Sequence, residues 1–170
     1  MSALPVTLGG QIALVLYVWP LVAAAISDYR ALRVPNWLTA TLACLFPVAA
    51  LLLGHDVNWL SHIAAGLIVL VAGAAMFHFG LMGGGDVKLL AAASLWMGLG
   101  QVVGFLFAVA LIGGVFSLLV LVLRNVLMQG MLLTVFGRVP HVTARGASIP
   151  YGIPIAIGGI LMAPTLPFIA

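Results

Sequence analysis

The feature that most limits which fold this chain can adopt is its series of long apolar runs separated by short polar turns. Hydrophobic residues make up 65% of its 170 residues, and only 5% are charged. A soluble domain usually has a charged share of about 25%. Six basic and three acidic residues cannot solvate the surface of a soluble domain of this length. We therefore exclude soluble globular, disordered and collagen-like proteins and predict an all-α polytopic membrane protein.

The apolar runs predict six transmembrane helices, because a bilayer core needs about 20 apolar residues per helix. Residues 87–123 are too long for one span, and the glycine-rich stretch Gly98–Gln101 predicts a turn between two. Arg30 is the first basic residue and follows the first run, so we expect a permanent helix and not a cleaved signal peptide. The predicted spans are Leu8–Ser27, Leu38–Gly54, Leu60–Leu81, Val87–Gly100, Val102–Leu123 and Ile149–Ile169.

The positions of the basic residues predict the orientation. The connections after spans one, three and five contain all six, namely Arg30, Arg33, Lys88, Arg124, Arg138 and Arg145. The positive-inside rule places these connections in the cytoplasm and both termini outside, on the periplasmic side. The short apolar segment Val126–Phe136 is predicted as an interfacial or cytoplasmic helix. Because the basic residues are scattered singly, we expect no nucleic-acid partner. Residues 1–170 are predicted to form a single membrane domain.

Two of the three aspartates lie at predicted membrane boundaries. Asp28 ends the first span and Asp86 begins the fourth, whereas Asp56 lies in a polar exterior turn. Antiparallel spans would bring Asp28 and Asp86 to the same cytoplasmic depth. An ionisable group near hydrocarbon indicates function by default. Two adjacent carboxylates would share one proton, so that one activates water and the other polarises a carbonyl. This predicts an aspartic protease that needs no metal or cofactor.

Each aspartate also has a purely structural interpretation. Asp86 follows Gly83, Gly84 and Gly85, which allow positive φ angles and close approach of a substrate backbone. These glycines can equally form a simple turn, with Asp86 capping the helix that follows. Asp28 can pair with Arg30 or Arg33 at an ordinary boundary. Neither aspartate decides the function alone.

Three motifs together resemble the type IV prepilin peptidases, in particular the short form that serves tight-adherence (Flp-type) pili. Ser27-Asp28-Tyr29-Arg30 is followed by Val34-Pro35-Asn36, Gly83–Asp86 fits the family's GxGD motif with Lys88 after it, and Ile149–Pro154 contains Pro-Tyr-Gly. The motifs fall at the predicted cytoplasmic ends of spans one, four and six.

The resemblance implies an intramembrane aspartic endopeptidase that removes the basic leader from prepilins or pseudopilins at the cytoplasmic face of the bacterial inner membrane. By this resemblance Asp28 and Asp86 are the catalytic pair. Longer members carry an N-terminal domain with paired CxxC motifs and also methylate the new N-terminus. Because this chain has one cysteine, Cys44, we expect neither a zinc site nor methyltransferase activity.

The remaining motif residues have predicted roles of their own. Pro35 and Asn36 are expected to start the second span or shape the site. Lys88 points away from Asp86 on a helix, so we expect it to anchor the span at the headgroups or to meet Asp28 or the substrate. The last motif, Pro150-Tyr151-Gly152, offers a hydrogen-bond donor in Tyr151, while Gly152 permits close helix approach.

Other chemistries have weaker support in the sequence. His62 and His78 are expected at the interface, and the four histidines lack the spacing of a metal site. Ser94 and Lys88 as a serine–lysine dyad would lie about 120° apart around a helix. Two rival functions remain. The aspartates could bind protons or cations in a small transporter, or the protein could be a non-catalytic pilus assembly factor.

Overall fold

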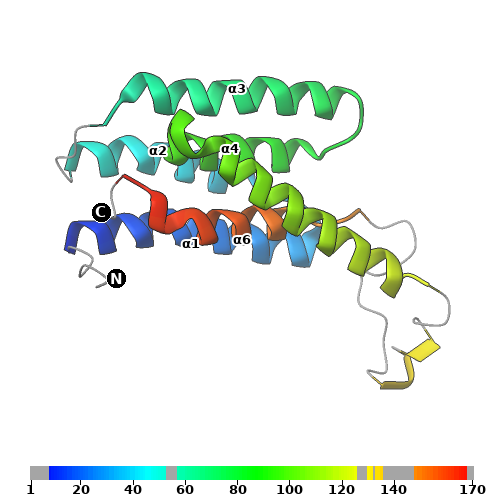
Figure 1. Cartoon of the computed structure of the whole chain (residues 1–170). Helices are drawn as coiled ribbons and strands as arrows, with labels where there is room; N and C mark the ends of the chain where they lie inside the picture. Colours follow the sequence, from blue (N-terminus) through cyan, green and yellow to red (C-terminus); the bar gives the residue numbers. More distant parts are fainter. Residues whose placement is uncertain (1–7, 53–56, 126–129, 132, 136–147, 168–170) are drawn as a thin grey trace.

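The computed structural model describes residues 8–52, 57–125, 130–131, 133–135 and 148–167. Apart from linkers and turns, these residues form helices and no strands, which confirms the predicted all-α class for this part of the chain (Figure 1). The N-terminal helix α1 connects through residues 32–35 to α2, and α3 and α4 follow. The elements are α1 (Leu8–Ala31), α2 (Asn36–Leu52), α3 (Trp59–His78), α4 (Gly84–Leu123), α6 (Gly152–Met162) and the short 3₁₀ helix η2 (Ala163–Thr165).

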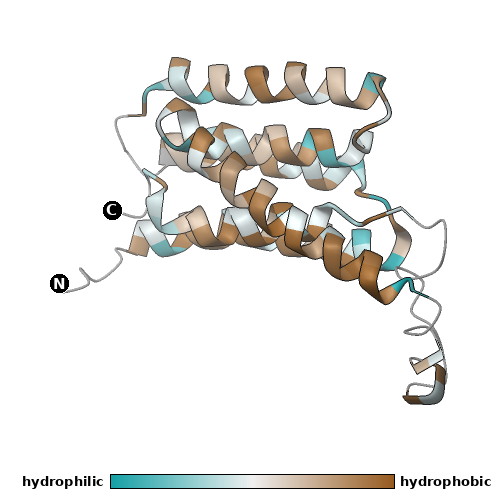
Figure 2. Ribbon diagram, turned by 45° about the vertical axis from the view of Figure 1, so that its right-hand side comes forward, coloured by the Kyte–Doolittle hydropathy of each residue, from teal (hydrophilic) through white to brown (hydrophobic). Residues whose placement is uncertain are grey.

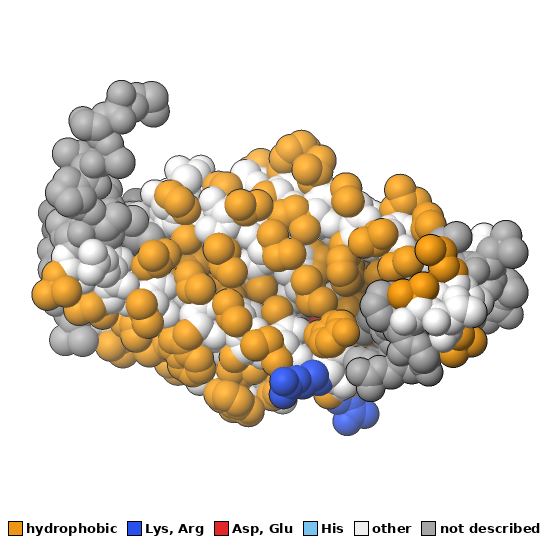
Figure 3. Space-filling view, turned by 90° about the horizontal axis from the view of Figure 1, so that it is seen from below, with side chains coloured by type: hydrophobic (Ala, Val, Ile, Leu, Met, Phe, Trp, Pro, Cys, Tyr) orange, Lys and Arg blue, Asp and Glu red, His pale blue; other side chains and the backbone are white. Residues whose placement is uncertain are grey.

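The surface is that of a membrane-embedded protein. Helices α1, α3 and α4 are long and apolar enough to cross a bilayer, while α2 and α6 are shorter apolar helices. Brown, hydrophobic residues run along the outside of the helices in Figure 2. In the space-filling view of Figure 3, hydrophobic side chains dominate and Lys or Arg side chains show only at one edge. The count of six crossings and the outward termini stay predictions.

Helix α4 is two helices joined at Gly98. This glycine has φ 65° and ψ 174°, a backbone conformation in which the helix cannot continue. The first part runs antiparallel to α3, since Val87 lies against Gly73 at one end and Leu95 bonds His62 at the other. The second part runs back beside α6 (Figure 1). The predicted turn at Gly98–Gln101 is therefore confirmed.

A buried histidine fastens the turn at Gly98. His62 is only 7% exposed, and its Nδ1 lies 2.8 Å from the carbonyl oxygen of Leu95. Its ring stacks on Phe46 of α2 at a centroid distance of 4.9 Å. The structure buries the imidazole of His62 between α2 and α4, with its Nδ1 bonded to the Leu95 carbonyl, and its interfacial depth stays a prediction. His78, at the end of α3, is exposed.

We expect Gly98→Ala to destabilise the fold. Its φ of +65° is unfavourable for any residue with a Cβ, and that Cβ would lie 3.1 Å from two atoms of the His62 ring. Such backbone strain costs about 1–3 kcal/mol. Thermal unfolding in detergent should show this loss, whereas Gly100→Ala, which meets nothing within 4 Å, should not. Equal unfolding temperatures for the two variants would contradict the expectation.

The packing gathers several helix ends at one end of the bundle. Helix α6 runs antiparallel to α1, with Gly152 against Asp28 and Gly159 against Tyr17. Trp96 in the first part of α4 donates its Nε1 hydrogen to the carbonyl of Leu42 in α2, at 2.8 Å. The end of α1 and the starts of α2, α4 and α6 consequently lie together, at the right-hand end in Figure 1.

Candidate active site

Asp28 and Asp86 line the same cavity, which has a volume of about 500 Å³. The cavity is bounded by the end of α1, the 32–35 linker, the start of α4 and the segment before α6. Its lining residues are Asp28, Leu32, Arg33, Val34, Pro35, Asn36, Gly83, Gly84, Gly85, Asp86, Ser148 and Ile149. The structure thus brings together the two side chains that sequence placed at one depth.

The N-terminus of α6 holds the side chain of Asp28. Asp28 is 4% exposed, and its Oδ2 accepts a hydrogen bond of 2.7 Å from the backbone N–H of Gly152. Gly152 is the first residue of α6, so its N–H has no partner within the helix, and the helix dipole favours a negative charge there. A Cβ on Gly152 would lie 2.8 Å from the same oxygen. The close approach predicted for Gly152 is therefore made to the carboxylate.

Asp86 lies in the first turn of α4, three residues after the helix-capping residue Gly83. A Cβ on Gly83 would come within 2.8 Å of the Asp86 Oδ2, so the carboxylate lies over the glycine. A negative charge in a first turn stabilises the helix. Asp86 can stabilise α4 and also take part in chemistry, because it lines the cavity and is only half-buried.

The glycine run acts through close packing and not through positive φ angles. Gly83 has a φ of −70°, and the positive φ near this point belongs to Gly80. A Cβ on Gly85 would lie 3.1 Å from the Cβ of Val34 and 3.2 Å from its carbonyl oxygen. The backbone that Gly85 admits is therefore the chain's own α1–α2 linker, which this contact holds against the start of α4.

Two motif residues, Pro35 at the end of the linker and Asn36 just after it, line the cavity. Helix α2 begins at Asn36, so the predicted start at Pro35 and Asn36 is confirmed. The hydroxyl of Ser27 donates to the Arg33 carbonyl at 2.9 Å, which fixes the linker to α1. Within the described residues, Asp28 bonds Gly152 and forms no ion pair with Arg30 or Arg33.

Lys88 contacts neither aspartate. Its Nζ donates a hydrogen bond of 2.9 Å to the Oδ1 of Asn36, which joins the starts of α2 and α4. Sequence reasoning expected a headgroup anchor or a contact with Asp28 or substrate. It missed this pair because the two residues are 52 positions apart, and no local pattern predicts their contact.

The side chains of Pro150 and Tyr151 in the last motif contribute less to the aspartate cavity than expected. The hydrogen-bonding group expected in Tyr151 lies against α4: its hydroxyl accepts a hydrogen bond of 3.2 Å from Ser117, and Tyr151 is not among the described residues that line the cavity. The Tyr151 ring packs closely against Gly113 of α4. Pro150 is buried at the start of α6. Ser148, which sequence reasoning did not select, lines the cavity instead.

The serine–lysine dyad finds no support in the described residues. The Ser94 hydroxyl donates to the Leu90 carbonyl in its own helix, at 2.8 Å. No three His, Cys, Asp or Glu side chains come together within the described part of the chain. Several residues considered above lie outside the described residues, namely His55, Asp56, Arg138, His141 and Arg145.

The sequence model of the type IV leader peptidase family matches residues 14–118. The chain belongs to this family. The match includes both aspartates and Lys88, whereas the last motif at 149–154 lies beyond it. No curated protein and no solved structure matched the chain. The protein is thus a membrane-embedded leader peptidase, and the cavity with its two carboxylates lies mainly within the matched region.

Proposed function

We propose that this leader peptidase is an aspartic endopeptidase with Asp28 and Asp86 as its catalytic pair. It removes the short basic leader from Flp-type prepilins or pseudopilins at the cytoplasmic face of the inner membrane. The supporting observation is the shared cavity, which two carboxylates from separate helices line together. The basic residues of the chain support the cytoplasmic orientation through the positive-inside rule, and the three sequence motifs support the Flp-type substrate.

The two carboxylates divide the chemistry between them. Both carboxylates lie at a helix N-terminus, but among the described residues only Asp28 accepts a backbone hydrogen bond there, from the Gly152 N–H. This bond favours its ionised form, so we assign Asp28 as the base. Asp86 carries the shared proton. Asp28 removes a proton from water, the water oxygen bonds the scissile carbonyl carbon, and Asp86 protonates the carbonyl oxygen. These steps give a tetrahedral intermediate with two hydroxyl groups on the former carbonyl carbon. Asp28 then gives its proton to the leaving nitrogen as the C–N bond breaks, and Asp86 takes a proton back from one of the two hydroxyl groups as the C=O bond forms again.

Cleavage of a defined substrate tests the proposal. The purified protein in lipid is mixed with a Flp-type prepilin, and mass spectrometry of the product identifies the new N-terminus. Removal of the leader at a single bond is the expected result. A transporter would instead give aspartate-dependent ion flux in liposomes without cleavage, and an assembly factor would give neither.

We expect chelators to leave the activity unchanged. The proposed reaction uses two carboxylates and water, so it has no step for a metal ion. Incubation with EDTA followed by dialysis should alter the initial rate of leader removal by less than about twofold, well below the 10²-fold or greater effect of losing a catalytic group. Restoration of a lost rate by added Zn²⁺ or Mg²⁺ would contradict the aspartic mechanism.

A further inference from the structure

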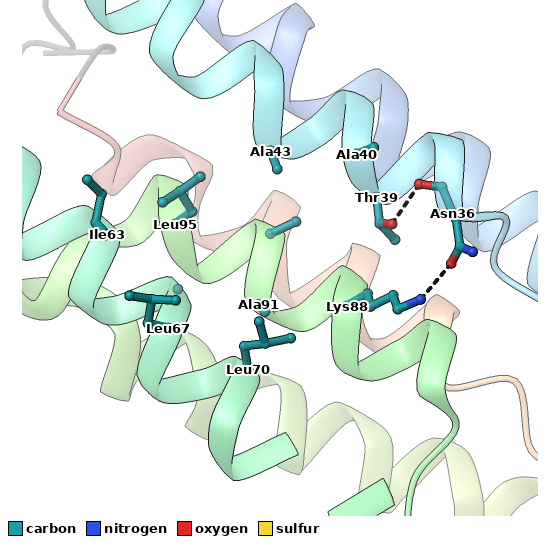
Figure 4. Close-up of a pocket in the computed structure, with 12 residues that line it drawn as sticks. Asn36, Thr39, Ala40, Ala43, Ile63, Leu67, Leu70, Lys88, Ala91 and Leu95 are labelled. Atoms are coloured by element: carbon teal, nitrogen blue, oxygen red, sulfur yellow. Dashed lines mark hydrogen bonds between the residues drawn. The ribbon is translucent and has the colours of Figure 1, made fainter. Parts of the chain in front are cut away.

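A second hollow lies beside the aspartate cavity, between α2 and α3. It is an apolar groove of about 600 Å³ with the first part of α4 as its floor (Figure 4). Helices α2 and α3 each pack against α4 and make few contacts with each other. The groove is lined by Asn36, Thr39, Ala40, Ala43, Ile63, Gly66, Leu67, Leu70, Lys88, Ala91, Ala92 and Leu95. Its walls thus combine small residues with a few large aliphatic ones.

The two ends of this groove differ. Its polar residues Asn36, Thr39 and Lys88 lie together at one end, and the hydrogen bond between Lys88 and Asn36 crosses that end (Figure 4). Beyond the other end, Phe46 of α2 stacks on His62 of α3 and closes the gap between these helices. The groove is therefore apolar along most of its length and polar only near the aspartates.

Asn36 connects the groove to the site, because it lines both the groove and the aspartate cavity. An occupant of the groove that reached past Asn36 would enter the space beside Asp28 and Asp86. Small residues along the groove let a helix backbone approach closely, as in other helix contacts within membranes. Exposed Leu67 and Ile63 would face such a helix in the hydrocarbon.

We propose that this groove binds the apolar helix of the prepilin, an inference that rests on the proposed function. The helix lies between α2 and α3, and the leader junction passes Asn36 into the aspartate cavity. The junction must unwind to be cut, which frees backbone carbonyl and N–H groups where little water is present. The Lys88 ammonium and the Asn36 amide exchange their mutual bond for bonds to these freed groups.

Photo-crosslinking tests where the helix binds. The probe is a synthetic peptide with a basic leader, a glycine junction and an apolar helix of about 20 residues. Benzoylphenylalanine replaces exposed Ala40 in the groove or, as control, exposed Ala110 on the second part of α4, both in an Asp86→Asn background that prevents turnover. We expect the peptide to be crosslinked from position 40 and not from position 110. Capture of lipid alone, or of a second copy of the chain, from position 40 would overturn the proposal.

Filling the groove in the active enzyme gives a second measurement. Ala40→Leu should raise the KM for the long peptide about tenfold, as overpacking of an apolar site does, with little change in kcat. Ala110→Leu should change neither. An unchanged KM for Ala40→Leu would overturn the groove proposal while leaving the peptidase intact. Failure of the wild-type enzyme to cut the peptide would instead count against the proposed function, and the crosslinks would still report the groove.

Discussion

Replacement of Asp28 or Asp86 by asparagine should lower the rate of leader removal by about 10²- to 10⁴-fold, the usual contribution of a positioned acid or base. In Asp28→Asn, the new amide would retain an oxygen to accept the Gly152 N–H but could not take a proton from water. In Asp86→Asn, the amide would keep the size of the side chain over Gly83 but would have no acidic proton to give. Initial rates with a prepilin, followed by mass spectrometry, measure both losses.

Asp56→Asn is the matched control, because Asp56 is the remaining acidic residue of the chain. It is predicted to lie in an exterior turn, and its variant should cleave at the wild-type rate. All three variants should remain folded and show a cooperative thermal transition, since each exchange preserves side-chain volume. Full activity of either Asp28→Asn or Asp86→Asn would refute the assignment of the catalytic pair.

Gly152→Ala should reduce kcat about 10²-fold, the effect of misplacing a reacting group by about 1 Å. The added Cβ would lie 2.8 Å from the Asp28 Oδ2 and 3.0 Å from its Cβ, so the carboxylate must move. The movement would break the hydrogen bond from the α6 N-terminus and turn Asp28 from the water. Binding of the substrate helix does not involve this contact, so KM should change little.

A second alanine variant distinguishes displacement of Asp28 from the general effect of adding a methyl group to a helix glycine. Gly114 lies in the second part of α4 with nothing within 4 Å of an added Cβ. Gly114→Ala should leave kcat unchanged and stabilise the helix by up to about 1 kcal/mol. If Gly152→Ala kept the wild-type kcat while unfolding normally, Gly152 would have no part in positioning Asp28.

The features that the sequence predicted well depend on local chemistry. A turn at Gly98 follows from a glycine-rich interruption in a run too long for one span. Asp28 lies near the C-terminal end of its helix and Asp86 near the N-terminal end of its own. Two helices of opposite direction therefore place both aspartates at the same end of the bundle. The start of α2 at Asn36 follows from the conformational limits of Pro35.

The features that the sequence missed depend on side-chain contacts between helices. Gly152 and Asp28 are 124 positions apart, and the helix N-terminus that holds Asp28 carries no side-chain signal, since the donor is a backbone N–H. The Tyr151 side chain contacts Ser117 and Gly113 on α4. The glycine run admits Val34 of the same chain, where a substrate strand was expected.

The sequence by itself determined that this protein is helical and embedded in the bilayer, and that two of its carboxylates adjoin the ends of apolar segments. Apolar length and charge position set these properties, and both can be counted along the chain. Only the tertiary structure decided which partner holds Asp28, that Lys88 bonds Asn36, and that a groove adjoins the cavity. These depend on how the helices rotate and pack about one another, which is fixed by many weak contacts between residues far apart in sequence.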